Sequence, residues 1–196
     1  MAVTRPLSLA VRLCRLAAAG PLAHAFSRSH CSRVERPRFS ATTALPCVYG
    51  PGACIARGLA VLARAEALAT GLGPYALQAA IAACHARAET AETTDWVRIA
   101  ALYKQLARLT GSPVVEVNRA VAIGMAYGPE AGLALLDQLE GLPALSGYHL
   151  LPSVRGDLLD KLGRSEEAKA AFARAAALTQ NERERALLLH RASGTS

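Results

Sequence analysis

The fold is decided by residues 149–180, which read HLLPSVRGDLLDKLGRSEEAKAAFARAAALTQ. Two runs with helical apolar spacing are separated there by Gly163, which favours two helices joined by a tight turn. The residues that set the pattern are Gly156, Leu159, Leu162, Gly163, Ala168, Phe172 and Ala175. A looser copy lies 37 residues upstream, where Ala131 and Leu135 precede Ala168 and Phe172 and Pro143 closes the unit. The chain therefore predicts repeated helical hairpins.

This spacing resembles that of tetratricopeptide (TPR) repeats, in which each helix pair buries the face that its neighbour offers. The predicted fold class is all-α: a short array of TPR-like helical hairpins with about eight helices and a disordered basic N-terminal tail. We place the boundary between the tail and the helical domain at residues 53 and 54. Because stacked helix pairs usually hold partners, we expect binding and no enzymatic activity.

Prolines, glycines and capping residues divide the rest of the chain into the expected helices. These span residues 55–69, 74–89, 95–109, 113–127, 129–140, 147–162, 165–178 and 181–192. Pro74, Pro113 and Pro129 each open a helix, where the missing N–H costs nothing. Thr179, with Glu182 three residues later, predicts a capping box for the last helix. No segment alternates with period two for long enough to predict a strand.

The apolar spacing also predicts which faces of these helices turn inward. The first expected helix has Ile55, Leu59, Leu62 and Ala65 on one stripe, and the second has Leu77, Ile81 and either Cys84 or His85. The third has Trp96, Ile99, Leu102, Tyr103 and Leu106, with Thr94 or Asp95 as its cap. Alternating charges in NERERALLLHR predict a solvated face for the last helix.

The net charge of +7 is unevenly distributed. Residues 1–53 carry seven arginines against the single acid Glu35, whereas residues 54–196 carry 15 basic and 14 acidic residues. The helical part is therefore nearly neutral and lacks the basic surface that nucleic-acid binding requires. We expect no direct sequence-specific DNA binding by residues 54–196.

Residues 1–53 are rich in Arg and Ser and are interrupted by prolines. Four interpretations fit this composition: a disordered tail, a segment foreign to the helical domain (a misplaced start or an out-of-frame junction), a targeting segment, or a basic nucleic-acid arm. We favour the first two. The apolar stretch 7–25 is too short, and too charged at Arg12 and Arg15, to predict a membrane span.

The five cysteines, at positions 14, 31, 47, 54 and 84, form no C-x-x-C pair. An odd number of unpaired cysteines predicts free thiols in a reducing compartment, so we expect the protein to be cytoplasmic. His30, Cys31 and Cys47 lack a fourth ligand at a fixed spacing, and we expect no metal.

No sequence pattern indicates catalysis. Cys84 and His85 resemble a nucleophile beside a base, but adjacent helical residues point about 100° apart and cannot engage each other. A core cysteine beside a half-buried histidine is the stronger interpretation. The chain has no Gly-rich phosphate loop, paired-carboxylate motif, nucleophile elbow or zinc signature, so we expect no cofactor and no small-molecule substrate.

The candidate protein-binding residues lie on residues 113–126 and 147–162, the first helices of two predicted hairpins, which we expect to line the concave side. They are Asn118, Arg119, His149, Arg155 and Asp157. Arginine donors in such a groove suit an acidic peptide or a carboxylate-bearing domain. The alternative is that these residues pair within the chain, with Glu116, Asp157 or Asp160 as partners.

Four segments carry a resemblance to a known family. They are GPYALQAAIAACHARAE (73–89), TDWVRIAALYKQL (94–106), SPVVEVNRAVAIGMAYGPEAGLALLD (112–137) and GYHLLPSVRGDLLDKLGRSEEAKAAFARAAALTQNERERALL (147–188). They resemble the C-terminal region of bacterial extracytoplasmic-function RNA polymerase sigma factors that carry a long TPR-like extension. The resemblance extends from about residue 55 to residue 192, and it fades near Arg57, where an acid is expected.

The resemblance implies a protein-interaction and regulatory domain in transcription initiation, with the RNA polymerase core or the sigma domains as partner. The two promoter-binding sigma domains have no counterpart in this chain, which implies a truncated form. The alternative is an independent TPR-like adaptor that binds an acidic peptide or protein partner.

Overall fold

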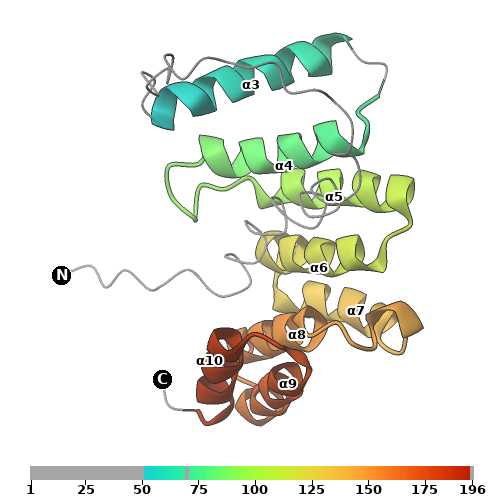
Figure 1. The fold of residues 1–196 in the computed structure, drawn as a ribbon, viewed down its shortest axis with the longest axis vertical. Coiled ribbons are helices and arrows are strands. Elements are labelled where there is room, and N and C mark those ends of the chain that lie inside the picture. The colour runs from blue at the N-terminus through green and yellow to red at the C-terminus, as the bar shows by residue number, and fades with distance from the viewer. Residues whose placement is uncertain (1–50, 69–70, 195–196) are drawn as a thin grey trace, which may run out of the picture.

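The computed structural model describes residues 51–68 and 71–194, which form eight α-helices and one 3₁₀ turn and contain no strand. The elements are α3 (Pro51–Leu68), α4 (Pro74–Arg87), α5 (Trp96–Thr110), α6 (Pro113–Tyr127), α7 (Pro129–Leu139), η1 (Pro143–Leu145), α8 (Leu150–Lys161), α9 (Ser165–Leu178) and α10 (Glu182–Ala192). Figure 1 shows them stacked from α3 at one end to α9 and α10 at the other. The all-α prediction is confirmed. The tail predicted for residues 1–53 lies outside the described residues, except for its last three, which begin α3.

Each helix packs mainly against the helices next to it in the sequence, from α3 against α4 to α9 against α10. Beyond sequence neighbours, α6 also touches α8 over a small contact. The pairs α6–α7 and α8–α9 are thus TPR-like hairpins whose first helices touch, and α10 covers the last pair. None of the described helices has the length and apolar character needed to cross a bilayer.

The predicted proline starts are confirmed, because Pro74, Pro113 and Pro129 each occupy the first turn of a helix. Asp95 caps α5 as predicted, since its side chain accepts a hydrogen bond from the backbone N–H of Arg98 at 2.9 Å. That helix ends at Gly111, which has φ 60° and donates its N–H to Ala107 O. Glycine adopts this left-handed conformation without the Cβ clash that other residues meet.

The predicted capping box at Thr179 is wrong. Asn181 caps α10, and its side chain accepts hydrogen bonds from the N–H groups of Arg183 and Glu184. The Thr179 hydroxyl donates instead to Glu184 Oε2 at 2.8 Å. Asn is as good a cap as Thr, and it stands nearer the first residue of the helix.

The predicted start of the sixth helix at residue 147 is also wrong, because α8 begins at Leu150. The chain first forms the turn η1, which Pro143 opens. The Tyr148 N–H then donates to Leu145 O at 3.0 Å. The backbone just before α8 therefore forms a turn, and the helix begins after it.

Two glycines allow α6 and α7 to approach each other closely. A Cβ on Gly132 would lie 2.9 Å from Ala120 O and 3.1 Å from Gly124 Cα. A Cβ on Gly124 would lie 2.7 Å from Leu158 Cδ2. Leu158 of α8 therefore packs into the space that these two glycines leave open, which joins one hairpin to the next.

The predicted register of the second hairpin is confirmed at Phe172, whose side chain is buried in the core. Its ring lies against Gly156 of α8, where a Cβ would stand 2.5 Å from Phe172 Cε1. The inward faces predicted for α4 and α5 are confirmed as well. The buried residues there are Leu77, Ile81, Cys84, Trp96, Ile99, Leu102, Tyr103 and Leu106.

The inward stripe predicted for the first helix is confirmed only in part. Leu62 is buried, but Leu59 and Ala65 are partly exposed and Ile55 is 47% exposed. The reason is that α3 packs against α4 at the end of the described stack, and α4 covers only part of its surface.

Candidate functional site

Arg155 joins two hairpins through ion pairs. Its guanidinium Nη2 lies 2.6 Å from Asp137 Oδ1 and 2.9 Å from Glu140 Oε2, both near the C-terminal end of α7. Arg174 of α9 lies 3.6 Å from the other carboxylate oxygen of Glu140. The Arg155 side chain is 18% exposed, whereas those of Asp137 and Glu140 are 61% and 46% exposed. The guanidinium is therefore held against the protein, and its carboxylate partners face solvent. Of the partners predicted for Arg155, neither Asp157 nor Asp160 is the one found.

Arg119 and Asn118 lie on the partly exposed side of α6. Arg119 Nη1 lies 3.0 Å from Glu116 Oε2, one helical turn earlier, which confirms the predicted local pair. Asn118 forms no hydrogen bond to another described residue. Because this ion pair is local to one helix, it leaves both side chains available to a partner.

His149 stands at the start of α8 and faces α10. Its Nε2 lies 3.2 Å from Glu184 Oε2, and that carboxylate oxygen also accepts the Thr179 hydroxyl. The neighbouring Tyr148 ring is tilted against the imidazole at 6.1 Å between centroids. Burial raises the pKa of Tyr148 to about 12, because the charged phenolate would lose its hydration.

Asp157 is the most buried of the candidate residues. It forms an ion pair with Nη1 of Arg191 from α10, and Arg191 Nη2 lies 3.7 Å from Asp160 Oδ2. The Arg191 guanidinium also lies over the Phe172 ring, 3.9 Å from its centroid. Arg191 therefore connects α8, α9 and α10, and its charge offsets that of the buried carboxylate.

The five candidate residues do not form one patch. His149 and Asp157 share a face of α8 that α10 covers, as their pairs with Glu184 and Arg191 show. Arg155 points the other way, toward α7. Asn118 and Arg119 remain at the surface of α6. Asp157 is the one of the five that is closed to a partner while α10 is in place; the side chains of His149, Arg119 and Arg155 are 27%, 23% and 18% exposed, and Asn118 is partly exposed.

Sequence reasoning missed the role of α10. Its alternating charges predicted a solvated face, yet Leu188 is fully buried and Arg191 pairs with Asp157. Arg185 Nη2 also donates to the backbone oxygen of Thr179 at 2.7 Å. Arg185, Leu188 and Arg191 are spaced three residues apart and share one face of the helix, which is a signal for an inward face but does not identify Asp157 as the partner of Arg191.

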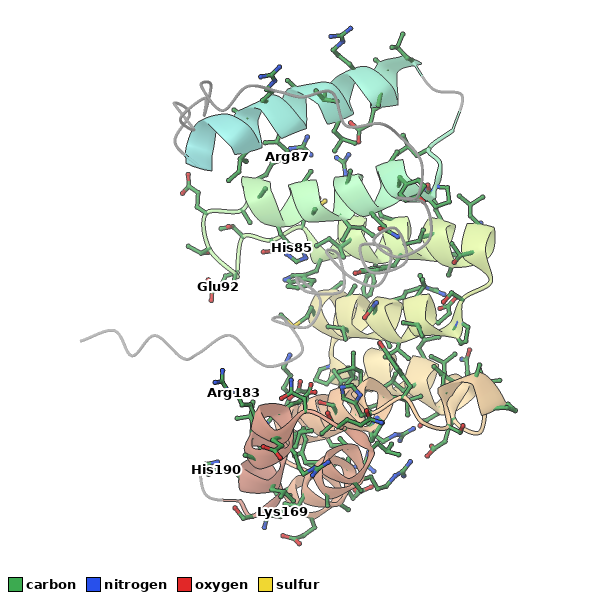
Figure 2. The ribbon with its side chains drawn as sticks, in the orientation of Figure 1. His85, Arg87, Glu92, Lys169, Arg183 and His190 are labelled. Carbon is green, nitrogen blue, oxygen red and sulfur yellow. The ribbon has the colours of Figure 1, made fainter. Side chains whose placement is uncertain are left out.

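A hollow of about 380 Å³ is lined by residues of α8, α9 and α10 and by Gly194. Figure 2 shows Lys169 and His190 at this end of the array, and both line the hollow. Lys169 Nζ lies 2.8 Å from Glu166 Oε1, and Arg191 is committed to Asp157 and Asp160. The charges around the hollow are therefore matched within the chain.

Cys84 and His85 have the arrangement that the sequence predicted. Cys84 is buried, and burial raises the pKa of its thiol. The His85 ring stands edge-on to Trp96, 5.3 Å between centroids. Among residues 51–68 and 71–194, no group of three or more His, Cys, Asp or Glu is arranged to hold a metal ion. His30, Cys31 and Cys47 lie outside the described residues.

Comparison with known proteins finds similarity to an uncharacterized protein of Rhizobium meliloti (strain 1021). The two sequences are 53% identical over 116 residues, which are 59% of this chain and 27% of that protein. Nearly three quarters of the relative therefore lies outside the match. No protein-family profile and no solved structure matches the chain.

Proposed function

We propose that this chain is the protein-interaction and regulatory part of an extracytoplasmic-function sigma factor, in a truncated form without the promoter-binding domains. In this proposal the helical array acts in the cytoplasm, where it contacts the RNA polymerase core or the sigma domains during transcription initiation. It has no catalytic activity and uses no cofactor. Its contact with the transcription machinery is with protein and not with DNA.

The observation that supports the proposal is the array of helical hairpins in the register that the TPR-like spacing of the sequence predicts. Gly156 packs on Phe172, and Gly124 and Gly132 make room for Leu158, so the small and large residues of neighbouring hairpins interlock. In arrays of this kind each repeat touches only its neighbouring repeats, and the array presents a long continuous surface to partners. In the Rhizobium relative the shared segment belongs to a much longer protein, which fits the truncation that we propose.

Arg119 and Arg155 are the proposed partner contacts among the five candidate residues. Both guanidinium groups are partly exposed, and both now pair with carboxylates of the same chain. A carboxylate on the partner would compete for the same guanidinium geometry, which favours two parallel hydrogen bonds. Asn118, beside Arg119, would add a neutral donor and acceptor.

The test is a binding measurement with two purified probes: core RNA polymerase, and the two sigma domains of an extracytoplasmic-function sigma factor lacking its own extension. We expect the full chain to bind at least one of them. Arg119→Ala with Arg155→Ala should weaken that binding, whereas Lys104→Ala with Arg108→Ala, at two exposed cations of α5, should not. Absence of binding to both probes rejects the proposal and favours an adaptor for another protein.

A further inference from the structure

One flank of α3 carries an apolar seam that the described helices cover only in part: it begins beside the contact with α4 and extends to exposed residues. Gly58, Val61, Ala65 and Leu68 succeed one another at alternating spacings of three and four residues, the spacing of a helix that packs along a second helix. Val61 is 61% exposed and Leu68 is 83% exposed. Large apolar side chains at this spacing are unusual on a free helix, which normally turns such a stripe toward a core.

The seam adjoins an open trough between α3 and α4. The trough has a volume of about 240 Å³ and is lined by Ile55, Gly58, Leu59 and Leu62 of α3 and by Ala79, Ala82, Ala83 and Ala86 of α4. Gly58 belongs to both the seam and the trough. The small alanines and Gly58 would let a further helix approach closely, as the glycines of α6 and α7 do.

The two ends of the described array differ in how much charge accompanies their exposed apolar residues. At the C-terminal end, α10 turns Leu188 inward and presents Leu187 (44% exposed) and Leu189 (52% exposed) among the charged residues Glu182, Arg183 and Arg185. At the other end, α3 presents Val61 and Leu68. Helical arrays are normally closed at both ends by a helix with a polar outer face, so α3 has the surface of an internal helix.

Charge selects what can cover this seam. Arg57 and Arg64 lie two helical turns apart on α3, along one flank of the seam. Both are exposed, and neither forms an ion pair with another described residue. The single acid of α3, Glu66, is turned inward and pairs with Arg98 of α5 at 3.5 Å.

Two occupants from the same chain fit poorly. A second copy that docks through its own α3 brings no acid to face Arg57 and Arg64, because Glu66 is the single acid of that helix and is turned inward. Residues 1–53 contain seven arginines and one acid, so they would repel the same flank. A helix with an apolar stripe and an acidic flank satisfies both the seam and the two arginines.

We propose that the seam formed by Gly58, Val61, Ala65 and Leu68, with Arg57 and Arg64 beside it, docks an acidic amphipathic helix of a partner protein. The inference builds on the proposed function, because it names a surface through which the array holds its partner. The docked helix stacks on α3 as each described helix stacks on the next. Its carboxylates pair with Arg57 and Arg64.

The experiment uses the full chain and two synthetic helical peptides with leucines at the seam-facing positions. One peptide carries glutamates on both flanks, and the other carries lysines at the same positions. Titration is followed by the amide NMR signals of the ¹⁵N-labelled protein. We expect the glutamate peptide to shift the signals of Gly58, Val61 and Leu68, and the lysine peptide to leave them unchanged at the same concentrations.

The variant Arg57→Glu/Arg64→Glu should weaken binding of the glutamate peptide at least tenfold and create binding of the lysine peptide. The matched reversal Lys104→Glu/Arg108→Glu on α5 should leave the affinity of the glutamate peptide unchanged. All of these side chains are exposed, so circular dichroism should show the same helix content in every variant.

Three outcomes overturn the inference: no binding of either peptide, equal binding of both, or insensitivity to the charge reversal at Arg57 and Arg64. A fourth outcome that overturns it comes from light scattering. If the wild-type chain is a dimer and Leu68→Asp makes it a monomer, a second copy of the chain occupies the seam. Peptide docking without binding to polymerase or sigma domains would reject the proposed function alone. Binding to them that survives Arg57→Glu/Arg64→Glu would reject the docking surface alone.

Discussion

The ring of Phe172 occupies the space that a Cβ of Gly156 would need. A Cβ there would lie 2.5 Å from Cε1, 2.7 Å from Cδ1 and 2.8 Å from Cζ of the ring. The large residue of α9 and the missing side chain of α8 are therefore one packing arrangement. This contact holds the two helices of the last hairpin together, and it makes the two positions energetically dependent on each other.

Substitution on either side of this contact should destabilise the fold. Phe172→Ala should cost about 3–5 kcal/mol, because it removes a buried ring and leaves a cavity. Gly156→Ala should cost about 1–3 kcal/mol through overpacking, despite the better helix propensity of alanine. In the Gly156→Ala background, Phe172→Leu should cost less than it does alone, since the smaller side chain relieves the clash. Urea unfolding of the wild type, Gly156→Ala, Phe172→Leu and the double variant measures this coupling, and additive costs would contradict it.

Arg191→Ala should be among the most damaging substitutions of a charged residue. It leaves the buried carboxylate of Asp157 without its guanidinium partner, at a cost of about 3–5 kcal/mol, and removes the contact with the Phe172 ring. Arg183→Ala on the same helix is the control, because Arg183 is exposed and should shift the melting temperature little. Equal melting temperatures for the two variants would show that Arg191 does not stabilise α10.

Replacing Arg155 should destabilise the fold more than replacing Arg119, although both residues are candidate partner contacts. Arg155→Ala should cost about 1–2 kcal/mol, because Arg155 bridges α8 to α7 through two ion pairs and most of its side chain is removed from solvent. Arg119→Ala should cost only about 0.2–0.5 kcal/mol, because its pair with Glu116 lies within one helix. Thermal unfolding measures the costs. Loss of partner affinity in Arg119→Ala with unchanged stability would assign that residue to the interface.

The helices were predictable because their signals are local. Pro74, Pro113 and Pro129 mark helix starts, Gly163 marks the turn between two helices, and the apolar spacing of α5 marks its buried face. The candidate site was less predictable, because ion pairs depend on which helices meet. Nothing local to Arg155 indicates that Asp137 and Glu140 lie opposite it, 18 and 15 residues earlier in the chain.

The failures at the two ends have a similar cause. Polar residues on α10 looked solvated because their sequence pattern alone does not reveal that Arg191 reaches a buried carboxylate. The stripe from Ile55 looked buried because its spacing is right, but α4 covers it only partly. In both helices the periodicity was correct, and the missing information was what lies against each face.

Cys84 should react slowly with thiol reagents while the protein is folded. Burial raises the pKa of its thiol, so less thiolate forms at a given pH, and the sulfur is also shielded from the reagent. The raised pKa implies that Cys84 contributes stability that is lost as the pH rises through its ordinary pKa and beyond. Alkylation at pH 8, with peptide mass spectrometry as the readout, should leave Cys84 unmodified until urea is added. Rapid modification in the native protein would contradict this.

Any DNA binding by the full chain should be independent of sequence and steeply dependent on salt. Most of the net charge belongs to the seven arginines before residue 54, and binding through such charges rests on counterion release. Replacing those seven arginines by glutamine should abolish retention of duplex DNA in a gel-shift assay. Promoter-specific binding that persists in this variant would overturn the proposal that the array contacts only protein.

The stacking of each helix on its sequence neighbour also bears on how the chain reaches its native state. Because the main contacts join consecutive helices, few long loops must close before a pair of helices can form. Topologies with such local contacts fold quickly, and folding can start at any hairpin and spread to the next. The α8–α9 hairpin is joined by one tight turn, and Phe172 packs against Gly156 between its helices. Its contacts are therefore local and well packed, as a folding nucleus requires. Order would then spread from it toward α3, the last and least covered helix of the series.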